Sequence, residues 1–185
     1  ETALQGVKQA SEIAVPTAAC GIIIGVVIQS GLATKVSKLI ANVGSSYLIL
    51  ALLITMLGCM LLGMALPTVA AYLVANVLFV PTLIGLNIQP LQANMFVFYF
   101  GIMAQITPPV CVASFTAAGI AGADSMKTGL TGFAYALVAF LVPFIFIYDP
   151  SILLVGTPLE IVKGTLILFL GTYLLASGMA GFFLV

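Results

Sequence analysis

Apolar residues occur along this chain in long runs that are separated by short polar or Gly/Pro-rich interruptions. The first run predicts a membrane-spanning helix over residues 12–31. Residues 32–43 place their apolar side chains on one helical face and two lysines elsewhere, which predicts a short arm at the membrane interface. The pattern therefore predicts helices that cross or lie along a bilayer.

Two short apolar arms, residues 47–62 and 69–80, follow this interfacial arm. The uncharged sequence Gly63-Met-Ala-Leu-Pro-Thr separates them. A helix rises about 1.5 Å per residue, so each arm is too short for a hydrocarbon layer roughly 30 Å thick. Two such arms joined by a Gly/Pro break favour a re-entrant helical hairpin over residues 47–80. Two ordinary short spans joined by a surface loop are the alternative.

Residues 95–123 predict a helix that is interrupted in its middle. Pro81 and the polar residues between 87 and 94 indicate an interface before this segment. Pro108 and Pro109 remove two backbone donors, and each disfavours helical geometry in the residue before it. Thr107 is a favoured N-cap, so a second half-helix is expected to begin here.

The remaining third of the chain predicts two further spans. Residues 119–129 contain Asp124 and Lys127 and are expected to form an aqueous loop. Residues 130–148 predict a spanning helix that ends before Asp149. Residues 149–185 predict a loop and an additional C-terminal transmembrane helix that begins at Gly164.

Composition places the chain in lipid and excludes most catalytic chemistry. It is 63% hydrophobic and 5% charged, with a mean hydropathy of +1.31. It has no histidine, and its three cysteines lie far apart in apolar runs, so neither an enzyme nor a metal or redox site is expected. A net charge of zero gives no footprint for nucleic acid. The expected partners are the lipid bilayer, other membrane helices and a solute, and no cofactor is expected.

The two interruptions are the candidate binding site. Backbone groups left unpaired in a membrane must be satisfied by protein, water or bound ions. Carbonyls at the end of one half-helix suit a cation, whereas N–H groups at the start of the next suit an anion. The cation candidates are Gly63, Met64, Ala65, Thr68, Gln105, Ile106 and Thr107. The substrate candidates are Val69, Ala70, Ala71, Gln105, Pro108, Pro109, Val110 and Ser114. For the hydroxyls, bonding to their own helix backbone is the alternative.

Four segments carry a resemblance to a known family. They are Gly63-Met-Ala-Leu-Pro-Thr-Val-Ala-Ala-Tyr, Phe96-Val-Phe-Tyr-Phe-Gly, Ile106-Thr-Pro-Pro-Val and Ala118-Gly-Ile-Ala-Gly-Ala-Asp. In this order they resemble the large membrane (DctM-like) subunit of TRAP transporters, in the fused 4TM/12TM branch that works with TAXI-type binding proteins. Residues 1–148 resemble its C-terminal repeat.

The resemblance implies an all-α, elevator-type transporter half, one of two inverted repeats, with a re-entrant hairpin and a discontinuous helix. It implies Na⁺-driven uptake of a small organic anion such as a carboxylate, with H⁺ as the other coupling ion to consider. The implied partners are a periplasmic solute-binding protein, the N-terminal repeat before Glu1, and a small membrane subunit or fused domain. The implied location is a bacterial or archaeal cytoplasmic membrane.

One departure and two alternatives accompany this interpretation. Many carriers of the wider family have an acidic residue at the hairpin tip, whereas this chain has Ala65-Leu-Pro-Thr, which leaves backbone coordination as the main hypothesis. A passive channel would conduct without a binding protein. A structural membrane subunit would be indifferent to substitution of Thr68 or Thr107.

Overall fold

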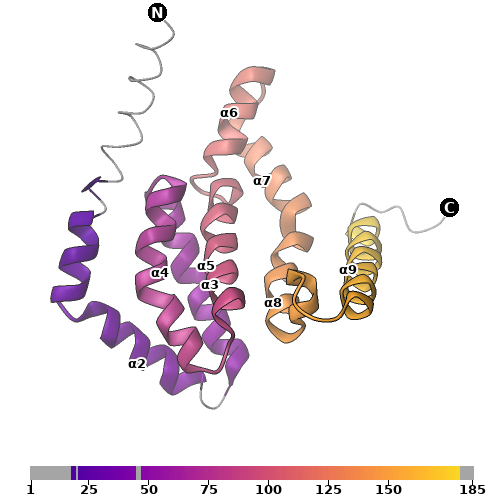
Figure 1. Ribbon diagram of the computed structural model, residues 1–185. Coiled ribbons are helices and arrows are strands. Elements are labelled where there is room, and N and C mark those ends of the chain that lie inside the picture. Colours follow the sequence, from indigo (N-terminus) through magenta and orange to yellow (C-terminus); the bar gives the residue numbers. More distant parts are fainter. Residues whose placement is uncertain (1–17, 20, 45–46, 180–185) are drawn as a thin grey trace, which may run out of the picture.

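The chain folds into helices throughout the part that the structure describes. The computed structural model describes residues 18–19, 21–44 and 47–179, and no strand occurs among them (Figure 1). Within these described ranges, three helices are long and apolar enough to cross a membrane: Thr68–Gly85, Ser125–Tyr148 and Pro158–Met179. The segments Gly21–Gln29 and Thr34–Gly44 pass the same test as a pair bent by 70°. The all-α prediction is confirmed, whereas part of the expected span 12–31 lies outside the described residues.

The elements are named here in chain order. The α-helices are α2 (Leu32–Gly44), α3 (Leu48–Ala65), α4 (Thr68–Gly85), α5 (Pro90–Met103), α6 (Val112–Ala121), α7 (Ser125–Ala136), α8 (Val142–Tyr148) and α9 (Pro158–Met179). The 3₁₀ segments are η1 (Ala104–Ile106), η2 (Leu137–Leu141) and η3 (Pro150–Leu153).

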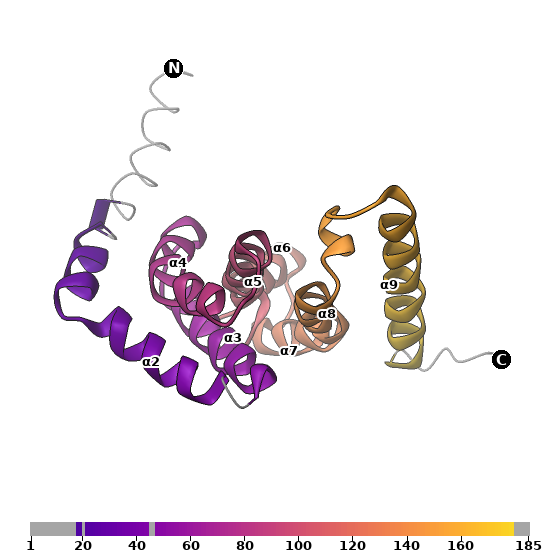
Figure 2. The ribbon, with the colours of Figure 1, turned by 60° about the horizontal axis from the view of Figure 1, so that its bottom comes forward.

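Helices α3, α4 and α5 form a bundle, and α2 lies along its outside (Figures 1 and 2). The bundle core is aromatic where α5 meets α8, because Phe96 packs edge-on against Phe100 and Phe144 at centroid distances of 4.9 and 5.5 Å. A hydrogen bond of 2.6 Å from Thr82 Oγ1 to Ser37 Oγ joins α4 to α2. The bundle therefore holds the hairpin and the first half of the interrupted segment together.

Helix α4 continues five residues beyond the expected hairpin end at residue 80. Pro81 lies inside the helix, which runs on to Gly85. A single proline removes one backbone donor, and the turns around it are held by the buried side chains of Val80 and Leu83. Pro81 therefore does not end the helix.

Helix α5 begins at Pro90 rather than near residue 95. Proline is favoured at the first helical position, and the Gln92 side chain accepts a hydrogen bond of 3.3 Å from the Gln89 N–H. Gln92 is also buried, and its Nε2 donates to the carbonyls of Phe146 and Ile147 at 2.7 and 3.0 Å. The polar residue that indicated an interface instead satisfies the end of α8.

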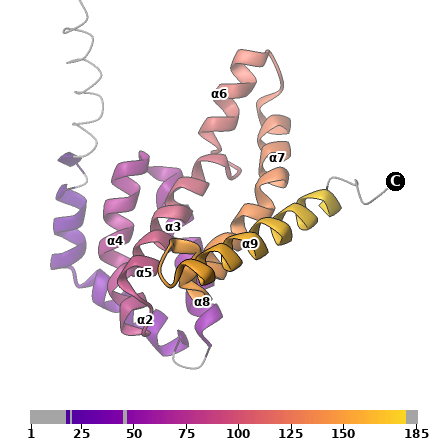
Figure 3. The same cartoon turned by 45° about the vertical axis from the view of Figure 1, so that its right-hand side comes forward.

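A 24-residue helical stretch, Ser125–Tyr148, follows α6 and includes α7, η2 and α8. It starts within the expected loop 119–129, because the Asp124 carboxylate accepts a hydrogen bond of 2.8 Å from the Lys127 N–H and so caps α7. Pro143 removes the donor that would reach the Ala139 carbonyl, which accepts instead from the Val142 N–H and, at 3.0 Å, from the Tyr99 hydroxyl. Figure 3 shows α6 and α7 side by side, extending beyond the bundle.

Helix α9 begins six residues before the expected Gly164. Thr157 and Glu160 form a reciprocal capping box, with 2.9 Å from the Thr157 N–H to Glu160 Oε2 and 3.4 Å from the Glu160 N–H to Thr157 Oγ1. The signal was present in the sequence as Thr-Pro-Leu-Glu. Only 6% of an 18-residue apolar window of this helix is buried, so most of its apolar surface is not covered by other described residues.

Candidate functional site

The tip of the α3–α4 hairpin, residues 63–68, is a tight two-residue connection. Helix α3 ends at Ala65, Leu66 and Pro67 are extended, and α4 starts at Thr68. The first intrahelical donor of α4 is the Ala71 N–H, which bonds the Pro67 carbonyl at 2.9 Å. The N–H groups of Thr68, Val69 and Ala70 therefore stand at an N-terminus without a side-chain cap.

Residues 104–111 interrupt the helical segment between α5 and α6 and are termed the break. Pro109 has no N–H, so the Gln105 carbonyl has no donor four residues on, as it would have in a continuous helix. The Thr107 N–H bonds the Ala104 carbonyl at 3.2 Å, and the Cys111 N–H bonds the Thr107 carbonyl at 3.1 Å. Regular helix resumes at Val112, and no side chain caps it. The break thus ends one helix and starts another within eight residues.

The tip and the break touch each other. Gln105 Nε2 donates a hydrogen bond of 3.0 Å to the Gly63 carbonyl. A Cβ on Gly63 would lie 2.6 Å from both the Gly101 carbonyl oxygen and the Ala104 Cβ, so only glycine allows this approach of α3 to α5. The carbonyl-rich end of α3 therefore lies against the start of the break.

The break packs against α7 on another side. A Cβ on Gly129 would lie 2.6 Å from Cys111 Sγ, and a Cβ on Gly132 would lie 3.2 Å from Ser114 Oγ. Two glycines of α7 thus accommodate the end of the break and the first turn of α6. Ser114 faces α7 and is 9% exposed, so its hydroxyl is not part of the contact between Gly63 and Gln105.

The other predicted residues occupy differing environments. Thr107 is 7% exposed, and its hydroxyl donates to the Met103 carbonyl at 2.8 Å, which leaves the oxygen lone pairs free to accept or coordinate. Ala70 and Ala71 are buried in the bundle, so only their backbone can serve a ligand. The residues that are half-buried are Met64, Thr68, Ile106, Pro108 and Val110, and those that are exposed are Val69 and Pro109.

A polar cluster between α4 and α5 was not predicted as a unit. Asn76 Nδ2 donates to Asn94 Oδ1 at 2.6 Å, and the Tyr72 hydroxyl lies 3.2 Å from the same oxygen. Asn76 therefore links α4 to α5 through an interhelical hydrogen bond. The spacing of Tyr72 and Asn76, one turn apart on one helix face, was the signal that could have identified the cluster.

No charged side chain contributes to the electrostatics of the candidate site, which depend on the dipoles of backbone and amide groups. Neither the tip nor the break contains an ionisable side chain other than the Cys111 thiol. Among the described residues, no group of three or more His, Cys, Asp or Glu side chains could hold a metal ion. Any ion bound between tip and break would be held by backbone carbonyls, hydroxyls and the Gln105 amide.

Comparison with protein families gives one result. A family model described as "Tripartite ATP-independent periplasmic transporter, DctM component" matches residues 1–161. Comparisons with curated proteins and with solved structures give no significant match. The match covers most of the chain and extends through the first four residues of α9.

Proposed function

The chain belongs to the DctM family of tripartite ATP-independent periplasmic (TRAP) transporters, and on that premise we propose that it carries out cation-coupled uptake of a small organic anion. As the large membrane component, it works with a periplasmic binding protein that delivers the solute. The proposed partner is of the TAXI type, the proposed coupling ion is Na⁺, and the proposed location is the cytoplasmic membrane. These three details rest on the segments at 63–72, 96–101, 106–110 and 118–124.

The hydrogen bond between Gln105 and the Gly63 carbonyl carries the proposal. It places the C-terminal end of α3 beside the start of the break, so two sets of helix-end carbonyls meet without an ionisable group. Na⁺ is a hard cation that is bound by oxygen ligands, and carbonyls at helix ends suit it. Cation binding would then hold the tip against the break.

The anion is proposed to bind at the uncapped helix starts. The amides of Thr68, Val69 and Ala70 lie at the start of α4, and those of Val112, Ala113 and Ser114 lie at the start of α6. Helix N-termini carry a partial positive charge and suit a carboxylate. With no lysine nearby in the sequence, the bound cation would supply the balancing charge, which makes uptake depend on it.

Movement of the hairpin with its bundle is proposed as the transport step. The resemblance to an elevator-type fold implies that α3–α5 carry the site across the membrane relative to the other repeat. The tip contact at Gly63 and the aromatic core favour motion of these helices as one body.

Uptake by the full-length carrier in proteoliposomes tests the proposal. The probes are radiolabelled mono- and dicarboxylates, screened first for binding to the purified periplasmic protein. We expect uptake only when the binding protein and an inward Na⁺ gradient are both present. Comparable downhill flux without the binding protein would indicate a channel. Uptake that proceeds equally without a Na⁺ gradient and without a proton gradient would refute secondary transport.

A further inference from the structure

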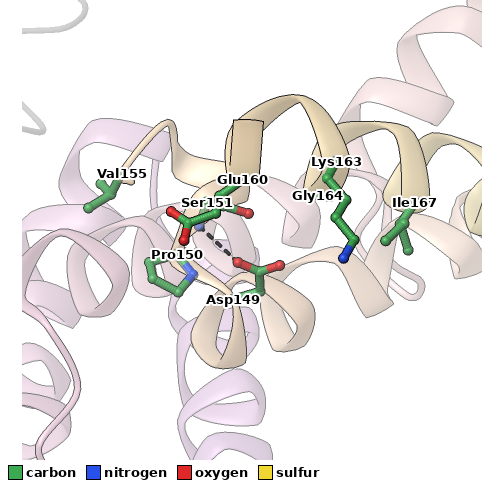
Figure 4. A pocket seen from close by; sticks show the side chains of 8 residues that line it. All are labelled: Asp149, Pro150, Ser151, Val155, Glu160, Lys163, Gly164 and Ile167. Atoms are coloured by element: carbon green, nitrogen blue, oxygen red, sulfur yellow. Dashed lines mark hydrogen bonds between the residues drawn. The ribbon is translucent and has the colours of Figure 1, made fainter. Parts of the chain in front are cut away.

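Two adjoining pockets lie where η3 and the end of α8 meet α9. A polar pocket of about 520 Å³ is lined by residues 149–151, 155, 160, 163, 164 and 167 (Figure 4). An apolar groove of about 200 Å³ runs between the 141–152 segment and α9. They share Asp149, Gly164 and Ile167, so they form one continuous amphipathic depression.

The polar pocket contains two carboxylates and one ammonium group. Asp149 and Lys163 extend from different walls, one from the chain before η3 and the other from α9 (Figure 4). Glu160 also lines the pocket, and no ion pair within 4.0 Å joins these charges among the described residues. Each carboxylate accepts one backbone N–H through a single oxygen, at 3.0 Å for Asp149 and 2.9 Å for Glu160. Both carboxylate residues are exposed, so their remaining lone pairs can accept from a ligand.

Ser151 adds an unsatisfied polar atom to this pocket. The residue is 5% exposed, and its hydroxyl forms no well-aligned hydrogen bond among the described residues, although it lies beside the Asp149 carboxylate and lowers the pKa of that group. It lies close against Gly164, where an added Cβ would collide with it. A buried hydroxyl without a partner is costly, and a ligand in the pocket would relieve that cost.

The apolar groove has the length of a lipid tail. It follows α9 from Gly164 to Leu175, a rise of about 16 Å at 1.5 Å per residue. Its walls are aliphatic, and Gly171 leaves open space on the α9 side. The groove lies between two helices that are apolar enough to cross a membrane, so an acyl chain reaches it directly from the bilayer.

The pocket lies at the ends of two helices that are long and apolar enough to cross a membrane. Asp149 directly follows the Ser125–Tyr148 stretch, and Glu160 lies in the first turn of α9, so both carboxylates stand at ends of membrane-crossing helices. Tyr148 is 63% exposed beside them, as expected of a side chain at the membrane interface.

We propose that this depression binds a phospholipid with an ethanolamine headgroup. The lipid ammonium would bond Asp149 and Glu160, its phosphate would pair with Lys163, and one acyl chain would fill the groove. Two carboxylates against one lysine give the pocket a net negative charge, which disfavours anionic lipids. A choline headgroup has the same net charge but no N–H to donate. The bound lipid would hold α9 against the end of α8 and η3. This proposal does not depend on the proposed transport function.

Native mass spectrometry of the purified full-length carrier tests the lipid preference. The carrier is delipidated and offered equal amounts of phosphatidylethanolamine, phosphatidylcholine and phosphatidylglycerol. We expect phosphatidylethanolamine to be retained about fivefold over each of the others. Equal retention of the three, or no retained lipid because another protein segment or a second copy fills the groove, overturns the proposal.

Paired variants locate the site. Asp149→Asn with Glu160→Gln keeps the backbone caps but removes both charges, and should reduce the ethanolamine preference about fivefold, to parity. Asp124→Asn, on the loop before α7, should leave the preference unchanged. Gly171→Leu should fill the groove and at least halve the lipid retained, whereas Gly119→Leu, equally open on α6, should not. If neither the double acidic variant nor Gly171→Leu changes lipid retention, the lipid binds elsewhere and the assignment is overturned.

Discussion

At the scale of single residues, the contact between tip and break depends on Gly63 more than on any hydroxyl. Its missing side chain lets α3 approach α5 until the Gly63 carbonyl meets the Gln105 amide. The carbonyl of Gly101 and the Ala104 methyl group occupy the space that a side chain would need. The contact between tip and break is therefore set by backbone packing, which cannot adjust as a long side chain could.

Gly63→Ala should separate the tip from the break. The added methyl group meets backbone at 2.6 Å, and overpacking of this kind typically costs about 1–3 kcal/mol. We expect a lower melting temperature and weaker cation dependence of uptake. Gly119→Ala is the matched control, because Gly119 has open space in α6 and the change should stabilise by up to about 1 kcal/mol. Equal effects of the two substitutions would contradict the packing role of Gly63.

At the scale of elements, a pair of consecutive prolines predicted the end of a helix, whereas single prolines did not end one. Pro108 and Pro109 together remove two consecutive donors, and α5 ends before them. Pro81 and Pro143 remove one donor each, and the chain remains helical around both because packing or a neighbouring hydroxyl compensates. Sequence alone does not reveal such compensation, since Tyr99 and Ala139 meet only in the folded chain.

The helix starts that the sequence did not predict have both local and long-range causes. The starts of α7 and α9 depend on caps by Asp124 and by the Thr157–Glu160 pair, and both signals can be read from sequence. The start of α5 was obscured because Gln92 suggested an interface, whereas it bonds α8 carbonyls 54 and 55 residues away. Gln105 and Gly63 are 42 residues apart in the chain, so no local sequence pattern predicts their contact either.

Replacing Pro108 and Pro109 with alanine tests whether the break matters. The two substitutions restore two donors and remove a penalty of about 3 kcal/mol per proline in a helix interior. The helix can then close across residues 104–111, which pairs the carbonyls proposed for the cation. We expect uptake to be lost while the melting temperature holds or rises. Pro81→Ala is the control, and it should leave uptake intact. Normal uptake in the double Pro108/Pro109 variant would contradict a role of the break in transport.

At the scale of the whole molecule, the helices fall into two groups. Helices α2–α5 form a packed bundle around the hairpin, while α9 lies at the opposite end of the molecule and contacts η2 and η3 (Figure 2). The family match covers the bundle and ends within the first turn of α9. The transport hypothesis therefore concerns the bundle and the break, whereas the lipid hypothesis concerns how α9 is held against the rest of the molecule.

The Na⁺ dependence of uptake by a Gln105→Leu carrier tests the central claim most directly. Leucine keeps the approximate size of the side chain but removes both the N–H donor to Gly63 and the amide oxygen. We expect the Na⁺ concentration for half-maximal uptake to rise about tenfold, equivalent to about 1.4 kcal/mol, while Gln29→Leu, an exposed glutamine on another helix, leaves it unchanged. An unaltered half-maximal concentration in Gln105→Leu would contradict a cation site between the hairpin tip and the break.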